Sequence, residues 1–211
     1  MNEITNENYL QKLFIDEAKP ALERHGYGGR IVPSYGTIDF YDENIIEINE
    51  QAPEEYQLDL ASVSCPSATS IGRRAFSSCY NLTQVDLPSA TSIGEDAFAS
   101  CYNLTKVDLP SAPSIGEYAF HSCYNLTQVD LPSATSIGDY AFSICHNLTR
   151  VILRTTDTVC IANPSAFSGT QIERGNGFIY IPASMYDAYA SVYGDFMVIF
   201  RKIEDYPEIC G

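Results

Sequence analysis

Hydrophobic residues return at a fixed interval of twenty-two positions through the middle of the 211-residue chain. Equivalent residues therefore form columns, of which six are apolar and one is glycine. The columns are Leu82, Leu104, Leu126 and Leu148; Val85, Val107, Val129 and Val151; Leu87, Leu109, Leu131 and Leu153; Ile71, Ile93, Ile115 and Ile137; Phe76, Phe98, Phe120 and Phe142; Cys79, Cys101, Cys123 and Cys145; Gly72, Gly94, Gly116 and Gly138. Such a period predicts one structural coil per unit, and the coils must stack because one coil cannot bury its apolar edge alone.

The first half of each unit has the pattern of a strand. In LTQVDLP, Leu82, Val85 and Leu87 are expected to point inward, while Gln84 and Asp86 alternate outward. The proline that follows has no N–H for a strand ladder, so the strand should end there.

The second half of each unit predicts a turn and then a short helix. In SATSIG, Ile93 is expected to fill the core and Gly94 to supply a backbone conformation that a side chain would resist. In EDAFASCY, one or two helical turns would bury Ala97, Phe98 and Cys101 on the outer wall.

The unit resembles the BspA-like family of bacterial leucine-rich repeats, whose pattern is close to L-T-x-V-x-L-P-x-x-x-x-S-I-G-x-x-A-F-x-x-C. Four copies match it almost letter for letter over about residues 60–153. The resemblance implies an α/β repeat fold, a leucine-rich-repeat solenoid. It would have right-handed coils, a parallel concave β-sheet and short convex helices, and it would be capped at both ends.

Three regions follow from the limits of the repeat. Residues 1–57 are predicted to form an acidic N-terminal cap or small α+β domain, and residues 58–176 the array of 22-residue units. Residues 177–211 are predicted to form a C-terminal cap with a helix. Its tyrosines, Tyr186, Tyr189 and Tyr193, would either pack on the last coil or form an exposed adhesive patch.

Outward positions of successive strands should form ladders about 4.8 Å apart on the concave face. Three interpretations of these ladders stay open: a solvated surface, a groove for a protein or glycan partner, and a weak divalent-cation site. A flat ladder supplies few of the six or more oxygens that Ca²⁺ needs, so no metal residue is assigned. The candidate partner-binding residues are Gln84, Asp86, Lys106, Asp108, Gln128, Asp130, Arg150, Ile152 and Tyr180.

The seven cysteines do not have zinc-site spacing. No C-x-x-C pair occurs, and four of the seven occupy one core column. Parallel stacked side chains also point in the wrong direction for disulfides between coils. We expect mostly buried, reduced thiols.

The net charge of −15 belongs mostly to residues 1–60, which carry thirteen acidic and four basic residues. A polyanion repels phosphate, so direct nucleic-acid binding is not expected. No run approaches the roughly 20 apolar residues that a membrane span needs. The first residues also lack the basic end and apolar block of a signal peptide.

No catalytic or cofactor-binding motif occurs, so the sequence predicts neither an enzyme nor a cofactor. The main hypothesis is a non-enzymatic protein-binding or adhesion-type scaffold, bacterial or phage-encoded. The alternative is an acidic inhibitor that occupies a basic nucleic-acid-handling protein through residues 1–57. The resemblance implies a cell-surface or secreted location, whereas the start of the chain suits a cytoplasmic or phage-associated protein.

Overall fold

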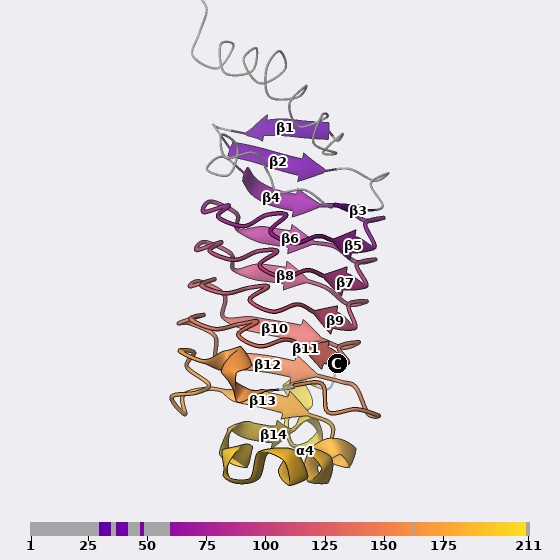
Figure 1. The fold of residues 1–211 in the computed structure, drawn as a ribbon, viewed down its shortest axis with the longest axis vertical. Helices are drawn as coiled ribbons and strands as arrows, with labels where there is room; N and C mark the ends of the chain where they lie inside the picture. The colour runs from indigo at the N-terminus through magenta and orange to yellow at the C-terminus, as the bar shows by residue number, and fades with distance from the viewer. Residues whose placement is uncertain (1–29, 35–36, 42–46, 49–59, 162, 210–211) are drawn as a thin grey trace, which may run out of the picture.

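The computed structural model describes residues 30–34, 37–41, 47–48, 60–161 and 163–209. The repeats stack as the coils of a solenoid, as the 22-residue period predicts (Figure 1). Each coil contributes one strand of three to five residues and, in most coils, a second strand of two. The longer strands of the array and its end are β4 (Leu60–Ser64), β6 (Gln84–Asp86), β8 (Lys106–Asp108), β10 (Gln128–Leu131), β12 (Arg150–Leu153), β13 (Phe178–Ile181) and β14 (Phe200–Lys202).

The shorter strands form a second parallel sheet. They are β3 (Glu47–Ile48), β5 (Ser70–Ile71), β7 (Ser92–Ile93), β9 (Ser114–Ile115) and β11 (Ser136–Ile137). In both sheets a residue pairs with its equivalent one period later, as Val85 does with Val107 and Ile93 with Ile115. The sequence columns are therefore columns in space.

The sheet of longer strands is interrupted once. One part has the order β1-β2-β4-β6-β8 and the other the order β10-β12-β13-β14, so no ladder joins β8 to β10 among the described strands. In β8, Val107 is only partly buried, whereas Val85 and Val129 are fully buried. The shorter strands β9 and β11 pair normally across this point.

The core runs through the solenoid as stacked columns. Phenylalanine rings lie parallel from coil to coil, with centroids 5.3 Å apart from Phe76 to Phe98, from Phe98 to Phe120 and from Phe120 to Phe142, and 5.8 Å apart from Phe142 to Phe167. Burying a phenylalanine contributes about 1.5–3 kcal/mol, so the column is a principal source of cohesion.

The short convex helices are not present in the described repeats, and this part of the sequence prediction was wrong. The segments are series of turns that contain two left-handed residues per coil, with φ between 55° and 65°. These residues are Arg74, Ser78, Asp96, Ser100, Tyr118, Ser122, Tyr140 and Ile144. An α-helix needs an unbroken run of right-handed residues, so it cannot form here.

Hydrogen bonding between coils explains the turns. The N–H of Phe98 donates to the carbonyl of Ala119 in the next coil, at 2.8 Å, while the N–H of Ala99 donates to Asp96 in its own coil, at 3.0 Å. Because donors alternate between the two coils, the turn segments also tie neighbouring coils together. Backbone donors that would lie unpaired beside the core are thereby satisfied.

The repeated glycine is required by close packing, not by its backbone angles. Gly94 has no positive φ, which corrects the expectation of an unusual conformation. A β-carbon there would lie 2.7 Å from the carbonyl carbon of Gly72, and one at Gly116 would lie 2.6 Å from that of Gly94. Only glycine allows the stacked backbones to approach this closely.

The C-terminal helix α4 (Tyr186–Tyr193) closes the described end of the array. Tyr189 and Tyr193 are buried, and the Tyr189 hydroxyl lies 3.1 Å from the Cys160 sulfur. The Tyr193 hydroxyl donates to the carbonyl of Ile161. Tyr189 and Tyr193 therefore pack on the last coil, which is the first of the two interpretations of the tyrosine spacing.

Described strands near the N-terminus continue both sheets. β2 (Thr37–Tyr41) pairs parallel with β4, and β3 pairs parallel with β5, while β1 (Arg30–Ser34) pairs antiparallel with β2. The remaining parts of residues 1–57 lie outside the described residues, and the region boundaries at 57/58 and 176/177 stay predictions.

Candidate recognition surface

The outward side chains of the longer strands form the surface that we call the strand face. Registered pairing places Gln84 beside Lys106, and Asp86 beside Asp108. Beyond the interruption, Gln128 pairs with Arg150 and Asp130 with Ile152, and Ile152 pairs with Tyr180. The nine predicted residues therefore lie on one face, in two rows.

Seven of the nine predicted residues are open to solvent in part or in full. Arg150 is half-buried, and six are exposed: Gln84, Asp86, Lys106, Asp108, Gln128 and Asp130. The other two, Ile152 and Tyr180, are only 8% and 6% exposed. The accessible part of the predicted surface therefore ends at Arg150.

The three carboxylates of the strand face differ in their partners. Asp86 accepts a hydrogen bond of 3.1 Å from the Ser64 hydroxyl. Asp130 forms a two-point ion pair with Arg154, at 2.9 and 3.3 Å. Asp108 is exposed and stands beside Asp86 in the ladder. Like charges at that spacing repel each other, so a donor that bridges Asp86 and Asp108 would be favoured.

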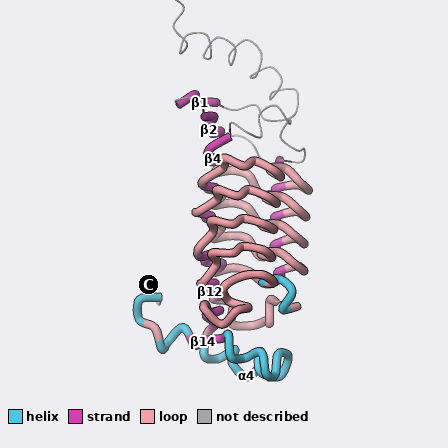
Figure 2. The backbone as a smooth tube through the Cα atoms, turned by 90° about the vertical axis from the view of Figure 1, so that its left-hand side faces the viewer, coloured by secondary structure: helices cyan, strands magenta, loops and turns pink. Residues whose placement is uncertain are grey.

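The C-terminal segment, residues 203–209, covers the end of the strand face. It consists of two short 3₁₀ turns, η5 (Ile203–Asp205) and η6 (Pro207–Ile209), and runs back along the outside of the sheet (Figure 2). Together with the strand face it forms a second, small apolar cluster, separate from the main core. Its members are Ile152, Phe178, Tyr180, Ile203, Tyr206 and Ile209.

Sequence reasoning missed this cover and the role of Arg154. Besides binding Asp130, Arg154 donates to the carbonyl of Ile209 at 2.9 Å and so ties the strand face to the segment. The available signal was Ile152, which is apolar at a position where Asp86 and its two equivalents are acidic. An apolar residue in an outward column indicates that something lies over it.

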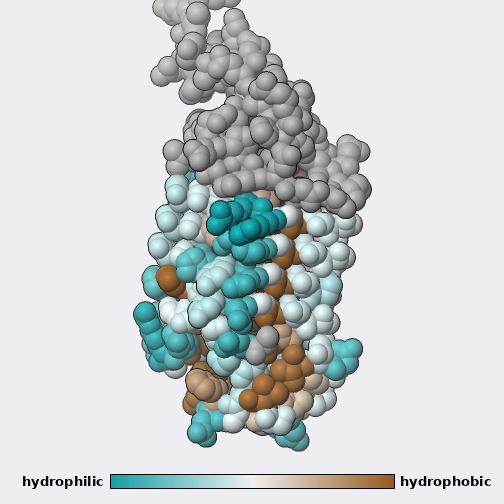
Figure 3. Space-filling model, viewed as in Figure 1, coloured by the Kyte–Doolittle hydropathy of each residue, from teal (hydrophilic) through white to brown (hydrophobic). Residues whose placement is uncertain are grey.

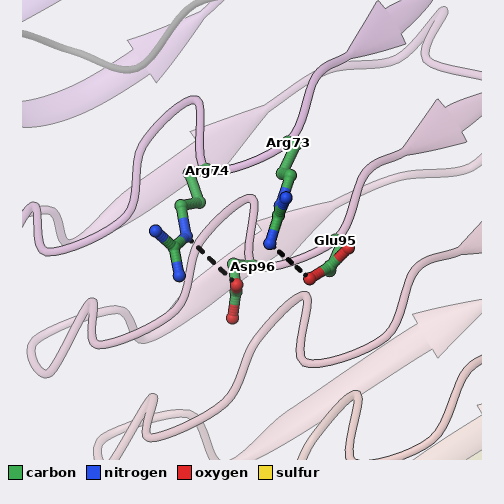
Figure 4. A network of polar contacts seen from close by, with 4 residues as sticks. All are labelled: Arg73, Arg74, Glu95 and Asp96. Carbon is green, nitrogen blue, oxygen red and sulfur yellow. Dashed lines mark hydrogen bonds and ion pairs between the residues drawn. The ribbon is translucent and has the colours of Figure 1, made fainter.

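The opposite surface, made by the turn segments, carries a stripe of hydrophilic residues (Figure 3). In the turn segments, Arg73 pairs with Glu95 at 2.9 Å and Arg74 with Asp96 at 3.3 Å, each one coil further on (Figure 4). Exposed pairs of this kind contribute about 0–1 kcal/mol, so they align coils more than they stabilise them.

A stack of aromatic rings runs from coil to coil at the position four residues before each longer strand. Ring centroids lie 4.9 Å apart from Tyr80 to Tyr102, 4.7 Å from Tyr102 to Tyr124 and 5.2 Å from Tyr124 to His146. Because the inner rings have both faces covered by neighbours, they present edges and hydroxyl groups to a partner. The stack therefore offers hydrogen bonds rather than a stacking platform.

The cysteines provide no reactive or metal-binding chemistry in the described part of the chain. Cys65, Cys160 and the four of the core column are reduced and buried, as predicted, while Cys210 lies outside the described residues. Burial raises the pKa of Cys79 to about 12 and raises that of Cys101 and Cys123 as well. The described residues contain no group of three metal-ligating side chains.

Two further sequence hypotheses were that the chain has no membrane-spanning segment and that residues 1–57 act as an acidic inhibitor. Among the described residues, no helix has the length and apolarity to cross a membrane. The inhibitor hypothesis rests on residues 1–57, most of which lie outside the described part, so it stays a prediction.

Comparison with known proteins gave one family and several similar structures. The model of the BspA type leucine rich repeat region matches six copies over residues 69–193, which is more than half of the chain. No curated protein matched the sequence.

Two similar solved structures come from bacteria. One is a leucine rich cell surface protein from Faecalibacterium prausnitzii, with 26% identity and a TM-score of 0.53; the match covers 85% of this chain and 50% of that one. The other is a leucine-rich repeat protein from Bacteroides ovatus, with 26% identity and a TM-score of 0.55; the match covers 78% and 44%. This chain thus spans about half the length of either protein.

Proposed function

Because the chain belongs to the BspA-type leucine-rich-repeat family, we propose that it is a non-enzymatic scaffold that recognises a protein or glycan partner through the open part of its strand face. The observation that carries the proposal is the registered double row of exposed polar side chains, led by Asp86 and Asp108. The sheet fixes the backbone positions of these residues, so no backbone entropy is lost there when a partner binds.

A bacterial cell-surface role belongs to the same proposal. It is supported by the family and by the similarity to the cell surface protein of F. prausnitzii. A stacked array suits such a role because it presents a long, rigid surface whose length follows the number of coils.

Charge reversal on the two opposite surfaces tests the proposal. The first variant carries Asp86→Lys and Asp108→Lys on the strand face. The matched control carries Glu117→Lys and Asp139→Lys on the turn segments and has the same change in net charge. Capture of surface proteins and glycans from host and bacterial extracts would be compared by mass spectrometry.

We expect the strand-face variant to capture at least ten-fold less partner than the native chain. The control should capture the native amount. Both variants should keep the native melting temperature within a few degrees, since all four positions lie outside the core. Equal losses in the two variants would mean that net charge governs capture, and retained capture in both would reject the strand face.

A further inference from the structure

The covered end of the strand face has a chemistry unlike the rest of the surface. Tyr206 meets the Tyr180 ring edge-on, with centroids 5.0 Å apart, and Ile203 and Ile209 are buried in the same cluster with Ile152. The three apolar residues of the C-terminal segment stand three apart in sequence, so one side chain per 3₁₀ turn faces the sheet.

Arginines surround this apolar cluster in a chain whose net charge is −15. Arg150 lies over the Tyr180 ring at 6.0 Å, and Arg201 lies over the Phe178 ring at 3.8 Å. Arg154 completes the set between Asp130 and the carbonyl of Ile209. The strand face is therefore divided into a carboxylate part and an arginine-rimmed apolar part.

The C-terminal segment complements that second part in charge. The residues between its apolar positions include Glu204, Asp205 and Glu208, and all three are exposed. The Glu204 carboxylate accepts a hydrogen bond of 2.9 Å from the Ala183 N–H. The segment is therefore acidic, the part of the face that it covers is rimmed by arginines, and its apolar side chains fill the centre. This combination of charge and spacing defines what the site can accept.

The segment is held on the face without becoming a strand of the sheet. The described sheet ends at β14, and the segment follows as two 3₁₀ turns whose amides at Tyr206 and Ile209 bond within the segment itself. Detaching it would break side-chain packing, the Arg154 bond and the bond of 2.9 Å that the Ala183 N–H donates to the Glu204 carboxylate, but no strand ladder. Elements of this type open at lower free energy than core strands.

We propose that the arginine-rimmed apolar end of the strand face is a docking site for an acidic peptide with apolar residues three apart, which the chain's own C-terminal segment occupies until such a peptide displaces it. The proposal builds on the recognition role above and names a partner class for the second part of the same face. Its site is Ile152, Tyr180 and Arg154.

The test uses the full-length chain with its own segment weakened by Tyr206→Ala and Ile209→Ala. The probe is a fluorescent synthetic peptide, IEDYPEI, the sequence of residues 203–209. We expect this variant to bind the peptide with a Kd below about 1 mM, at least ten-fold more tightly than the native chain, whose site is occupied. Adding Arg154→Gln, or using the charge-reversed peptide IKKYPKI, should weaken binding at least ten-fold.

Absence of binding by a weakened variant with a native circular dichroism spectrum would overturn the proposal, and so would equal binding of the charge-reversed peptide. If the variant fails to fold, hydrogen exchange of the native chain decides. The amides of Tyr206 and Ile209 should exchange at least ten-fold faster than ladder amides of β12 and β13, and equal rates would reject a displaceable segment. None of these readouts involves Asp86 or Asp108, so failure here leaves the charge-reversal test of the proposed function intact.

Discussion

The thiol of Cys123 donates a hydrogen bond to the carbonyl of Phe98 in the preceding coil, across 3.3 Å. Cys101 makes the same bond to Phe76, and the sulfur of each is fully buried. The cysteine column thus acts as a row of small apolar residues that also satisfy backbone carbonyls.

Reagents for thiols should therefore reach this column only when the chain unfolds. Deep burial and a raised pKa leave Cys79, Cys101 and Cys123 as unreactive thiols near neutral pH. We expect labelling at pH 8, mapped to each cysteine by mass spectrometry, to proceed at the rate of global unfolding. Labelling of Cys123 well ahead of the loss of circular dichroism would contradict this.

Gly116→Ala should destabilise the chain by about 1–3 kcal/mol, because the new methyl group would press on the backbone of the preceding coil at Gly94. Gly175→Ala is the control: it has free space around it but a φ of 81°, so it carries only the left-handed penalty of about 1 kcal/mol. Urea unfolding measures both. A smaller loss at Gly116 than at Gly175 would argue against close packing as the reason for the glycine.

Ser100→Gly should stabilise the chain by about 0.5–1 kcal/mol, because Ser100 has a φ of 62° that glycine adopts without steric cost. The same change at Ser111, an exposed serine without a positive φ, should destabilise by about 0.4–1 kcal/mol through the entropy of the unfolded chain. Opposite signs in thermal unfolding support the assignment of left-handed turns, and equal signs count against it.

Phe120→Ala should cost about 3–5 kcal/mol, since it leaves a cavity between two stacked rings, those of Phe98 and Phe142. Phe196 is 58% exposed, so Phe196→Ala should change the free energy of unfolding by only about 0.5 kcal/mol. Chemical denaturation of the two variants would be compared with the native chain. Similar values for both would exclude the ring column as a main source of stability.

Acidification should weaken the fold through His121. Burial lowers its pKa from the ordinary 6.5, an effect that the charge of Asp96 opposes, and its Nδ1 lies 2.7 Å from the Ser143 hydroxyl. The unfolded chain then binds the proton more readily, so stability is full above pH 6.5 and falls as the pH drops through the lowered folded pKa. His121→Ala, which copies Ala99 of the previous coil, should flatten this part of the pH profile. An unchanged slope in that variant would assign it to other groups.

The repeat columns made most of the solenoid predictable. Val85 and Ile93 were placed correctly from spacing alone, because a strict period forces equivalent residues into register. The conformation of the turn segments was not predicted. Ala97 and Phe98 are compatible with a helix, and a serine such as Ser100 does not by itself indicate a left-handed conformation. Hydrogen bonds to the next coil outweigh that local cost, and a single coil cannot reveal them.

The strand face was predictable only in its polar part. The row from Asp86 to Asp130 follows from alternation within each strand. Ile152 is covered by a segment that lies more than fifty positions away in the sequence. Contacts of Arg154 and Tyr206, which are not part of the repeat pattern, hold that segment in place. Contacts between residues that are not repeat equivalents leave no repeating pattern in the sequence. The sequence could therefore indicate that something covers Ile152, but not which segment does so.

The glycine column has a consequence for how such a molecule can grow. Gly94 and Gly116 allow adjacent backbones to lie in direct contact. This contact fixes the distance from one coil to the next. Duplicating a unit in the gene therefore lengthens the protein by one strand spacing, about 4.8 Å, without distorting the units on either side. Evolution can in this way adjust the length of the solenoid in equal increments.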